Sequence, residues 1–103
     1  MTDIDMTRLA AEAMGTRVEQ YGLEARNADS GEPYWPLHDD AQAMALVKRF
    51  KLNIGQLSGG AIQVFTAFDA GHIYQSDGTD LNRAIVEVCA KMQAAKAINQ
   101  GGK

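Results

Sequence analysis

The segment between residues 81 and 95 constrains the fold most, because its apolar residues recur every three or four positions. A stripe with this period predicts a long helix that buries one face. The stripe consists of Leu81, Ala84, Ile85, Val88, Cys89, Met92 and Ala95. Asp77, Thr79 and Asp80 precede it and can cap the first turn. A helix of this kind needs partner elements that cover its apolar face, so the rest of the chain must supply them.

Two earlier segments show the same helical period. In the first, the apolar positions are Met6, Leu9, Ala10, Ala13 and Met14, and the preceding Thr2, Asp3 and Asp5 offer N-caps. Gly15 follows directly, and glycine enters the left-handed conformation that ends a helix. In the second, the stripe is Ala43, Leu46, Val47 and Phe50, and Asp39 or Asp40 stands at its N-cap. The chain therefore predicts three helices.

Residues 50–75 predict strands. Phe50, Leu52 and Ile54 alternate with polar residues, which is typical of a half-buried strand. Ser58-Gly59-Gly60 predicts a hairpin turn, and the return strand would run from Ala61 to Phe68. Because this strand is apolar on both faces, we expect it in the middle of a sheet, covered on both sides. A short strand from His72 to Gln75 is expected next.

The segment between residues 16 and 38 predicts an edge hairpin. Val18 to Ala25 can form one strand, although Gly22 weakens it. Asn27 to Pro33 is a turn by composition, and Tyr34-Trp35 then lies between two prolines that favour extended backbone. Together these elements predict one α+β domain over residues 1–98, with a flexible tail at 99–103. Its three helices would pack on a small, mostly antiparallel sheet as helix, sheet and helix layers.

The composition indicates the cellular compartment and the distribution of charge. The 103 residues suffice for a core without a disulfide, and one cysteine suits a reducing compartment. We expect a cytoplasmic protein, since the start lacks a signal-peptide pattern and no apolar run is long enough to span a membrane. Residues 1–40 hold nine acids against three arginines, a net −6, whereas residues 41–103 are net +3. With a pI of 5.2, direct binding of nucleic acid is disfavoured.

Two stretches of the sequence carry a family resemblance. The first runs from Tyr34-Trp35-Pro36-Leu37-His38-Asp39-Asp40 into an amphipathic helix, and the second is Arg83-Ala84-Ile85-Val86. Together they resemble the phage ABA-sandwich domain, a family of small hypothetical proteins of phages and prophages. The resemblance implies a layered helix–sheet–helix fold and a phage accessory gene. It implies no catalytic residue.

Three candidate chemical sites have simpler structural interpretations. His38-Asp39-Asp40 could ligate a metal with His72, but adjacent turn residues diverge and an aspartate is expected to cap the following helix. Cys89 lies on an apolar stripe, which predicts a packed thiol and not a nucleophile. Ser58-Gly59-Gly60 lacks the lysine and the following helix of a phosphate loop. We therefore predict no catalytic residue, no cofactor and no metal.

The hypothesis favoured by the sequence is a non-enzymatic protein that binds a host macromolecule, for example an inhibitor of a bacterial defence complex such as CRISPR-Cas. Tyr34 and Trp35 are the candidate aromatic anchors, unless they pack in the core, and Glu32, Asp39 and Asp40 would form an acidic rim. The alternative is a small-molecule or nucleotide-binding protein with its site at an oligomer interface, near His38, Asp39 and His72. A hydrolase that uses those residues is the third hypothesis. The sequence leaves monomer and homodimer open.

Overall fold

The computed structural model describes residues 2–21, 24–66 and 74–101. Its helices are α1 (Asp3–Met14), α2 (Asp40–Phe50) and α3 (Leu81–Gly101). Its strands are β1 (Val18–Tyr21), β2 (Glu24–Asn27), β3 (Asn53–Gln56), β4 (Ile62–Phe65) and β5 (Gln75–Gly78). A short 3₁₀ turn, Ser58–Gly60, joins β3 to β4.

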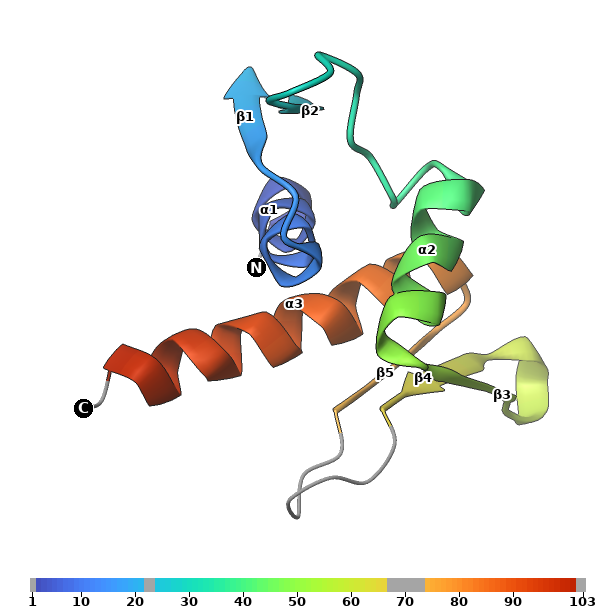
Figure 1. The fold of residues 1–103 in the computed structure, drawn as a ribbon. Helices are drawn as coiled ribbons and strands as arrows, with labels where there is room; N and C mark the ends of the chain where they lie inside the picture. The colour runs from blue at the N-terminus through green and yellow to red at the C-terminus, as the bar shows by residue number, and fades with distance from the viewer. Residues whose placement is uncertain (1, 22–23, 67–73, 102–103) are drawn as a thin grey trace.

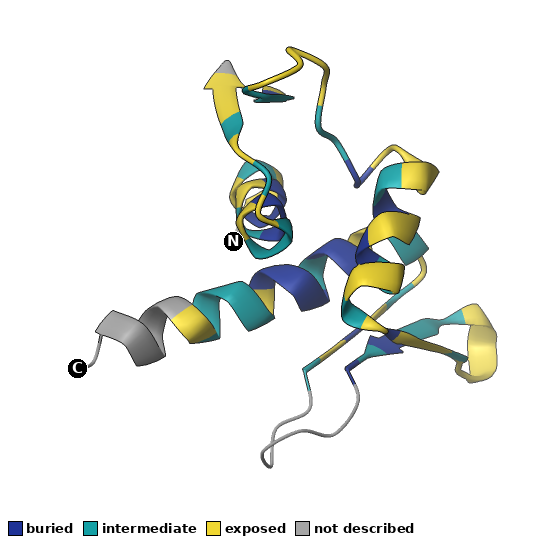
Figure 2. Ribbon diagram, viewed as in Figure 1, coloured by how far each residue is buried: buried dark blue, intermediate teal, exposed yellow. Residues whose placement is uncertain are grey.

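Helix α3 is the central element of the fold (Figure 1). Helices α1 and α2 both pack on it, and strands β4 and β5 contact it as well. The sequence stripe is confirmed where the helix is most enclosed, since Ala84, Ile85, Val88 and Cys89 are buried. Val86 and Ala90 lie off that stripe and are buried too, because neighbours cover more than one face of α3 (Figure 2).

The helix ends follow the residues that were predicted to cap them. Thr2 forms a capping box with Asp5 at the start of α1, and Gly15 ends the helix at φ 74°. Asp39 caps α2 by accepting a hydrogen bond from the Gln42 backbone N–H at 3.0 Å. The prediction that an aspartate at this position caps the helix is thus confirmed for Asp39.

The strands form two small antiparallel sheets, so the α+β class with antiparallel strands is confirmed. Strands β1 and β2 make one sheet, and the other has the order β3-β4-β5. The expected single sheet between helix layers is therefore wrong. Instead, α1 packs on both α3 and β2, while the three-stranded sheet packs on α3 at β4 and β5.

The expected strand from Val18 to Ala25 is in fact a hairpin. Tyr21 pairs with Glu24, and Val18 pairs with Asn27 at the other end. A continuous strand was a weak expectation because glycine destabilises strand interiors. Residues 22–23 lie outside the described residues.

The turn predicted between Asn27 and Pro33 is confirmed. The Asn27 Oδ1 atom accepts hydrogen bonds from the Asp29 and Ser30 backbones at 2.8 and 3.0 Å, which is an Asx-type turn. Gly31 then adopts φ 75°. The chain returns to pair Pro33 with Arg26, which brings the following Tyr34 back against β2.

The three-stranded sheet confirms one prediction and corrects two. Strand β4 lies in the middle, as expected, and Val64 on it is fully buried. The expectation that Ile54 is buried is wrong: it lies on the edge strand β3 and is 43% exposed. The described last strand is Gln75–Gly78, so of the expected strand His72 to Gln75 only its final residue is in a strand here, while residues 67–73 lie outside the described part.

Side chains of α3 fasten the outer strand β5. The predicted pair of Glu87 and Lys91 is present at 3.5 Å. The Ser76 hydroxyl also donates to Glu87 Oε1 at 2.7 Å, and Lys91 Nζ donates to the Gln75 carbonyl at 2.8 Å. Helix α3 itself continues to Gly101, so its backbone extends past residue 98, where the tail was expected to begin.

Candidate functional site

The two aromatic residues predicted as anchors are half-buried. The Tyr34 backbone N–H donates to the Ala25 carbonyl at 2.8 Å, which holds this residue beside β2. Burial raises the pKa of the Tyr34 hydroxyl to about 12, with a smaller contribution from Cys89. Trp35 packs against the hydrophobic core, and its ring stacks on His38 with centroids 5.5 Å apart. Both rings therefore contribute to packing, and only part of each surface is available to a partner.

Gln42 holds the aromatic segment on helix α2. Its Oε1 atom accepts a hydrogen bond from the Trp35 backbone at 2.7 Å, and its Nε2 atom donates to the Pro33 carbonyl at 3.0 Å. This clamp was not predicted, because it joins residues seven and nine positions apart across a loop. The clamp fixes the position of Trp35 relative to the start of α2.

The predicted acidic residues do not form one rim. Asp39 is engaged as the cap of α2. Glu32 is exposed in the turn that follows β2, and Asp29 pairs with Arg17 at 3.6 Å. Asp40 differs from these, because its Oδ1 atom accepts a hydrogen bond from Asn82 Nδ2 on α3 at 2.8 Å. Among the predicted residues, Asp40 connects the two helices.

A groove of about 590 Å³ lies beside Asp40, between the first turns of α2 and α3. We refer to it as the α2–α3 groove. Its lining consists of Asp40, Ala43, Met44, Thr79, Asp80, Leu81, Asn82 and Ile85. Ala43 and Ile85 are buried, whereas Met44 is 42% exposed, so part of a large apolar side chain is accessible at the groove. Among the described residues, the groove lining thus combines an apolar surface with two carboxylates and contains no cationic side chain.

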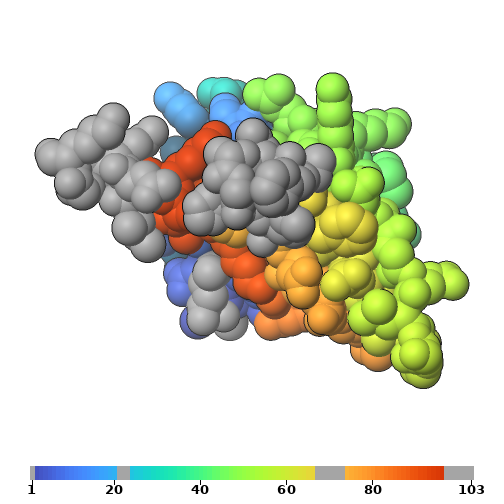
Figure 3. All heavy atoms as spheres, turned by 90° about the horizontal axis from the view of Figure 1, so that it is seen from below, coloured from blue at the N-terminus to red at the C-terminus, as the bar shows by residue number. Residues whose placement is uncertain are grey.

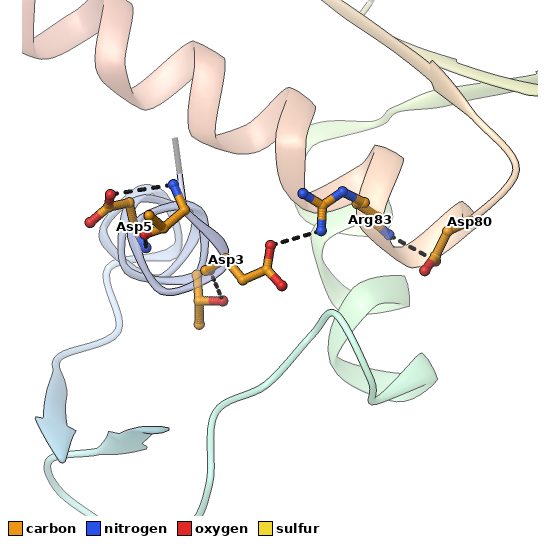
Figure 4. A network of polar contacts seen from close by, with 6 residues as sticks. Asp3, Asp5, Asp80 and Arg83 are labelled. Atoms are coloured by element: carbon orange, nitrogen blue, oxygen red, sulfur yellow. Dashed lines mark hydrogen bonds and ion pairs between the residues drawn. The ribbon is translucent and has the colours of Figure 1, made fainter. Parts of the chain in front are cut away.

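An arginine near the groove is already paired. Figure 4 shows Arg83 on α3 pointing toward Asp3 of α1, with Nη1 and Oδ1 2.8 Å apart. This hydrogen bond and the charge of Asp3 raise the pKa of Arg83. The Asp80 carboxylate accepts instead from the Arg83 backbone N–H at 3.1 Å. Because the guanidinium is committed to Asp3, Asp40 and Asp80 keep the groove acidic.

The other candidate chemical groups are placed as follows. Cys89 is fully buried, and burial raises the pKa of its thiol to about 12, as expected for a packed cysteine. Ser58–Gly60 turns between two strands and does not precede a helix. His72 lies outside the described residues. Within the described residues, no group of three or more histidines, cysteines and acids could hold a metal ion.

Among the described segments, no helix is both long enough and apolar enough to cross a membrane. Comparison of the chain with protein-family models, with curated proteins and with solved structures gives no match. The resemblance to the phage family therefore stays a prediction.

Proposed function

We propose that this protein is a binding module that accepts an apolar side chain of a partner protein, flanked by basic residues, in the α2–α3 groove. The single observation that supports the proposal is the exposure of Met44 beside buried Ala43 and Ile85, between Asp40 and Asp80. Methionine is flexible and polarisable, so it adapts to apolar side chains of different shape. An apolar centre with a charged border is typical of protein interfaces.

The two parts of the groove would serve different steps of binding. Burial of an apolar anchor against Met44 and Leu81 supplies affinity, at about 25 cal/mol for each Å² removed from water. Asp40 and Asp80 attract a basic partner and mainly raise the association rate, an effect that salt screens. The half-buried Trp35 lies in the turn before α2, the helix that carries Asp40.

The biological setting of the proposal comes from the sequence resemblance. It suggests a phage or prophage accessory protein in the bacterial cytoplasm, whose partner would be a host protein or complex. An inhibitor of a nucleic-acid-binding defence complex fits the chemistry, because such complexes present basic channels that an acidic groove complements. No catalytic role is included, since Cys89 is packed and the aspartates here serve as caps and surface charges.

Capture from a bacterial lysate tests the proposal when it is combined with groove variants. Met44→Lys places a positive charge at the exposed centre of the groove and should abolish capture. Ala45→Lys is the matched control, because Ala45 is exposed on the same helix but does not line the groove. Asp40→Asn with Asp80→Asn keeps amide oxygens for the polar contacts while removing both charges. We expect this double variant to bind more slowly at low salt.

The capture results with these variants distinguish binding in the α2–α3 groove from binding elsewhere. Capture that survives Met44→Lys would contradict the proposal, and its loss with Ala45→Lys would place the binding surface elsewhere on α2. Capture of no protein by the wild type would overturn the proposal. All variants should first give the far-ultraviolet circular dichroism spectrum of the wild type, because these four side chains are exposed or half-exposed and contribute little to the core.

A further inference from the structure

The outer edge of strand β3 is open in the part of the chain that the structure describes. The sheet order β3-β4-β5 leaves β3 with a neighbour on one side only. Two large apolar residues are exposed at this edge: Ile54 is 43% exposed, and Leu57, just after the strand, is 41% exposed. Ile54 pairs with the buried Val64, so both side chains lie on the sheet face that packs on the core. Ile54 nevertheless stays partly exposed, because the helices do not cover this end of the face completely.

The hydrogen-bonding pattern shows which backbone groups point away from the sheet. The Leu57 N–H donates to the Ala61 carbonyl at 2.8 Å, so Leu57 faces β4. In an antiparallel ladder, residues face the partner strand at every second position. Gly55 and Asn53 therefore face β4 as well. The N–H and C=O groups of Ile54 and Gln56 point outward, where a further strand can pair with them.

The short edge strand β3 lacks two of the features that usually keep a sheet edge unpaired, namely proline and charged side chains. The strand sequence Asn53-Ile54-Gly55-Gln56 contains no proline and no charged residue. Natural edges are commonly protected by lysines, prolines or bulges, and an unprotected edge is a template for strand addition. Two apolar side chains on an open edge strengthen that tendency, because an added strand can cover them.

The charge around the edge indicates the chemistry of the added strand. Residues 41–66 contain three basic residues and no acid. The bases are Lys48, Arg49 and Lys51, all exposed, at the end of α2 that leads directly into β3. This segment, green to yellow in Figure 3, occupies one side of the molecule. An acidic segment is complementary to it, whereas a second copy of the same edge would bring like charges together.

We propose that β3 binds an extended, acidic segment of a partner protein as an added strand. The backbone of Ile54 and Gln56 would pair with the segment, apolar side chains of the segment would cover Ile54 or Leu57, and its carboxylates would meet the bases at the end of α2. Strand addition of this kind draws its affinity from main-chain hydrogen bonds and its specificity from alternate side chains. This site is separate from the α2–α3 groove and does not depend on it.

Amide hydrogen exchange tests the proposal at single residues. The probe is a capped nine-residue peptide of alternating valine and glutamate, and its control is the same peptide with lysine in place of glutamate. In the free protein, the amides of Ile54 and Gln56 should exchange rapidly, while those of Gly55 and Leu57 are protected by β4. The glutamate peptide at saturation should slow the exchange of Ile54 and Gln56 by about tenfold or more, and the lysine peptide should not.

Variants identify the groups that make the contact. Gln56→Pro removes an outward N–H without breaking the pairing with β4, since proline is tolerated at sheet edges. It should lower the affinity for the glutamate peptide by about tenfold, which is close to the effect of losing one hydrogen bond. Gln56→Ala removes the side chain alone and should bind as the wild type does. Lys48→Gln with Arg49→Gln should weaken binding at low salt and leave little difference at high salt.

Several results would overturn the proposal. Absence of protection at Ile54 and Gln56 with saturating peptide is one, and equal binding of both peptides is another. Protection that rises with protein concentration in the absence of peptide would show that a second copy occupies the edge. If a single-stranded oligonucleotide displaces the peptide and binds more tightly, the basic side chains at the end of α2 would be assigned to nucleic-acid binding. The Met44→Lys variant should leave the peptide result unchanged, so failure of the groove hypothesis is distinguishable from failure of this one.

Discussion

Arg83 of α3 donates a hydrogen bond to Asp3 of α1 at 2.8 Å, although 80 positions separate the two residues in sequence. The contact joins the first turns of the two helices, as Figure 4 shows. It also joins the acidic first part of the chain to the basic second part. The charge asymmetry of the sequence is therefore partly cancelled in space at this contact.

The pair of Asp3 and Arg83 should contribute little to stability. Both side chains are about half exposed, so solvent screens their attraction. A double-mutant cycle with Asp3→Ala and Arg83→Ala, measured by urea denaturation, should give a coupling of about 0.2–1 kcal/mol. Arg17 and Asp29, which are more exposed and 3.6 Å apart, form the comparison cycle and should couple more weakly. A coupling well above 1 kcal/mol would contradict the expected screening.

Core substitutions in α3 should be costly on more than one face of the helix. Ile85 is buried on the predicted stripe, and Ile85→Ala should lower the free energy of unfolding by about 2–4 kcal/mol. Val86 lies off the stripe but is equally buried, and Val86→Ala should cost more than about 1 kcal/mol, because it removes two buried methyl groups. Met44→Ala at an exposed site is the control, expected within about 0.5 kcal/mol of the wild type. A neutral Val86→Ala would show that α3 is covered on one side only.

The sequence predicted what is local and missed what depends on the meeting of distant segments. Caps at Thr2, Gly15 and Asp39 follow from neighbouring residues, so they could be predicted. The exposure of Ile54 could not, because its alternation with polar residues does not reveal that β3 lies at an edge beyond the helices. The groove beside Met44 required the first turns of α2 and α3 to meet, and no local pattern encodes that meeting. Of the predicted site residues, only Asp40 lines it.

Alkaline pH should destabilise the fold through Tyr34 and Cys89. Burial raises their pKa values to about 12 from ordinary values of 10.0 and 9.0, so the unfolded chain releases these protons at lower pH. Their contribution to stability is complete below pH 9 and is lost as pH rises toward 12. The melting temperature should therefore fall over this interval. The melting temperature of the Tyr34→Phe variant should fall less steeply with pH than that of the wild type. Parallel curves for the two proteins would argue against a raised pKa for Tyr34.

Removal of divalent cations should leave the fold unchanged. Asp39 is occupied as a helix cap, and Asp40 accepts a hydrogen bond from Asn82, so neither carboxylate depends on a metal. Dialysis against a chelator should give the same melting curve as the untreated protein. A structural metal contributes directly to folding energy, so its loss would lower the melting temperature markedly. Such a loss, reversed by zinc or manganese, would assign a metal role to residues outside the described part, His72 among them.

Asp39 separates the effects of charge and capping at the start of α2. The Asp39 carboxylate accepts a hydrogen bond from the Gln42 backbone N–H at 3.0 Å. Asp39→Ala should destabilise the protein by about 0.5–2 kcal/mol, the usual cost of losing such a cap.

Asp39→Asn is the matched control for the cap, since asparagine caps helices about as well as aspartate. It should keep most of the stability that the alanine variant loses, while it removes the negative charge. Gln42 also holds the Trp35 backbone, so loosening the first turn of α2 should reach the chain's single tryptophan. Asp39→Ala should therefore shift Trp35 fluorescence toward that of a solvated indole, whereas Asp39→Asn should leave it unchanged. Equal stability and fluorescence in both variants would mean that the first turn of α2 forms without this cap.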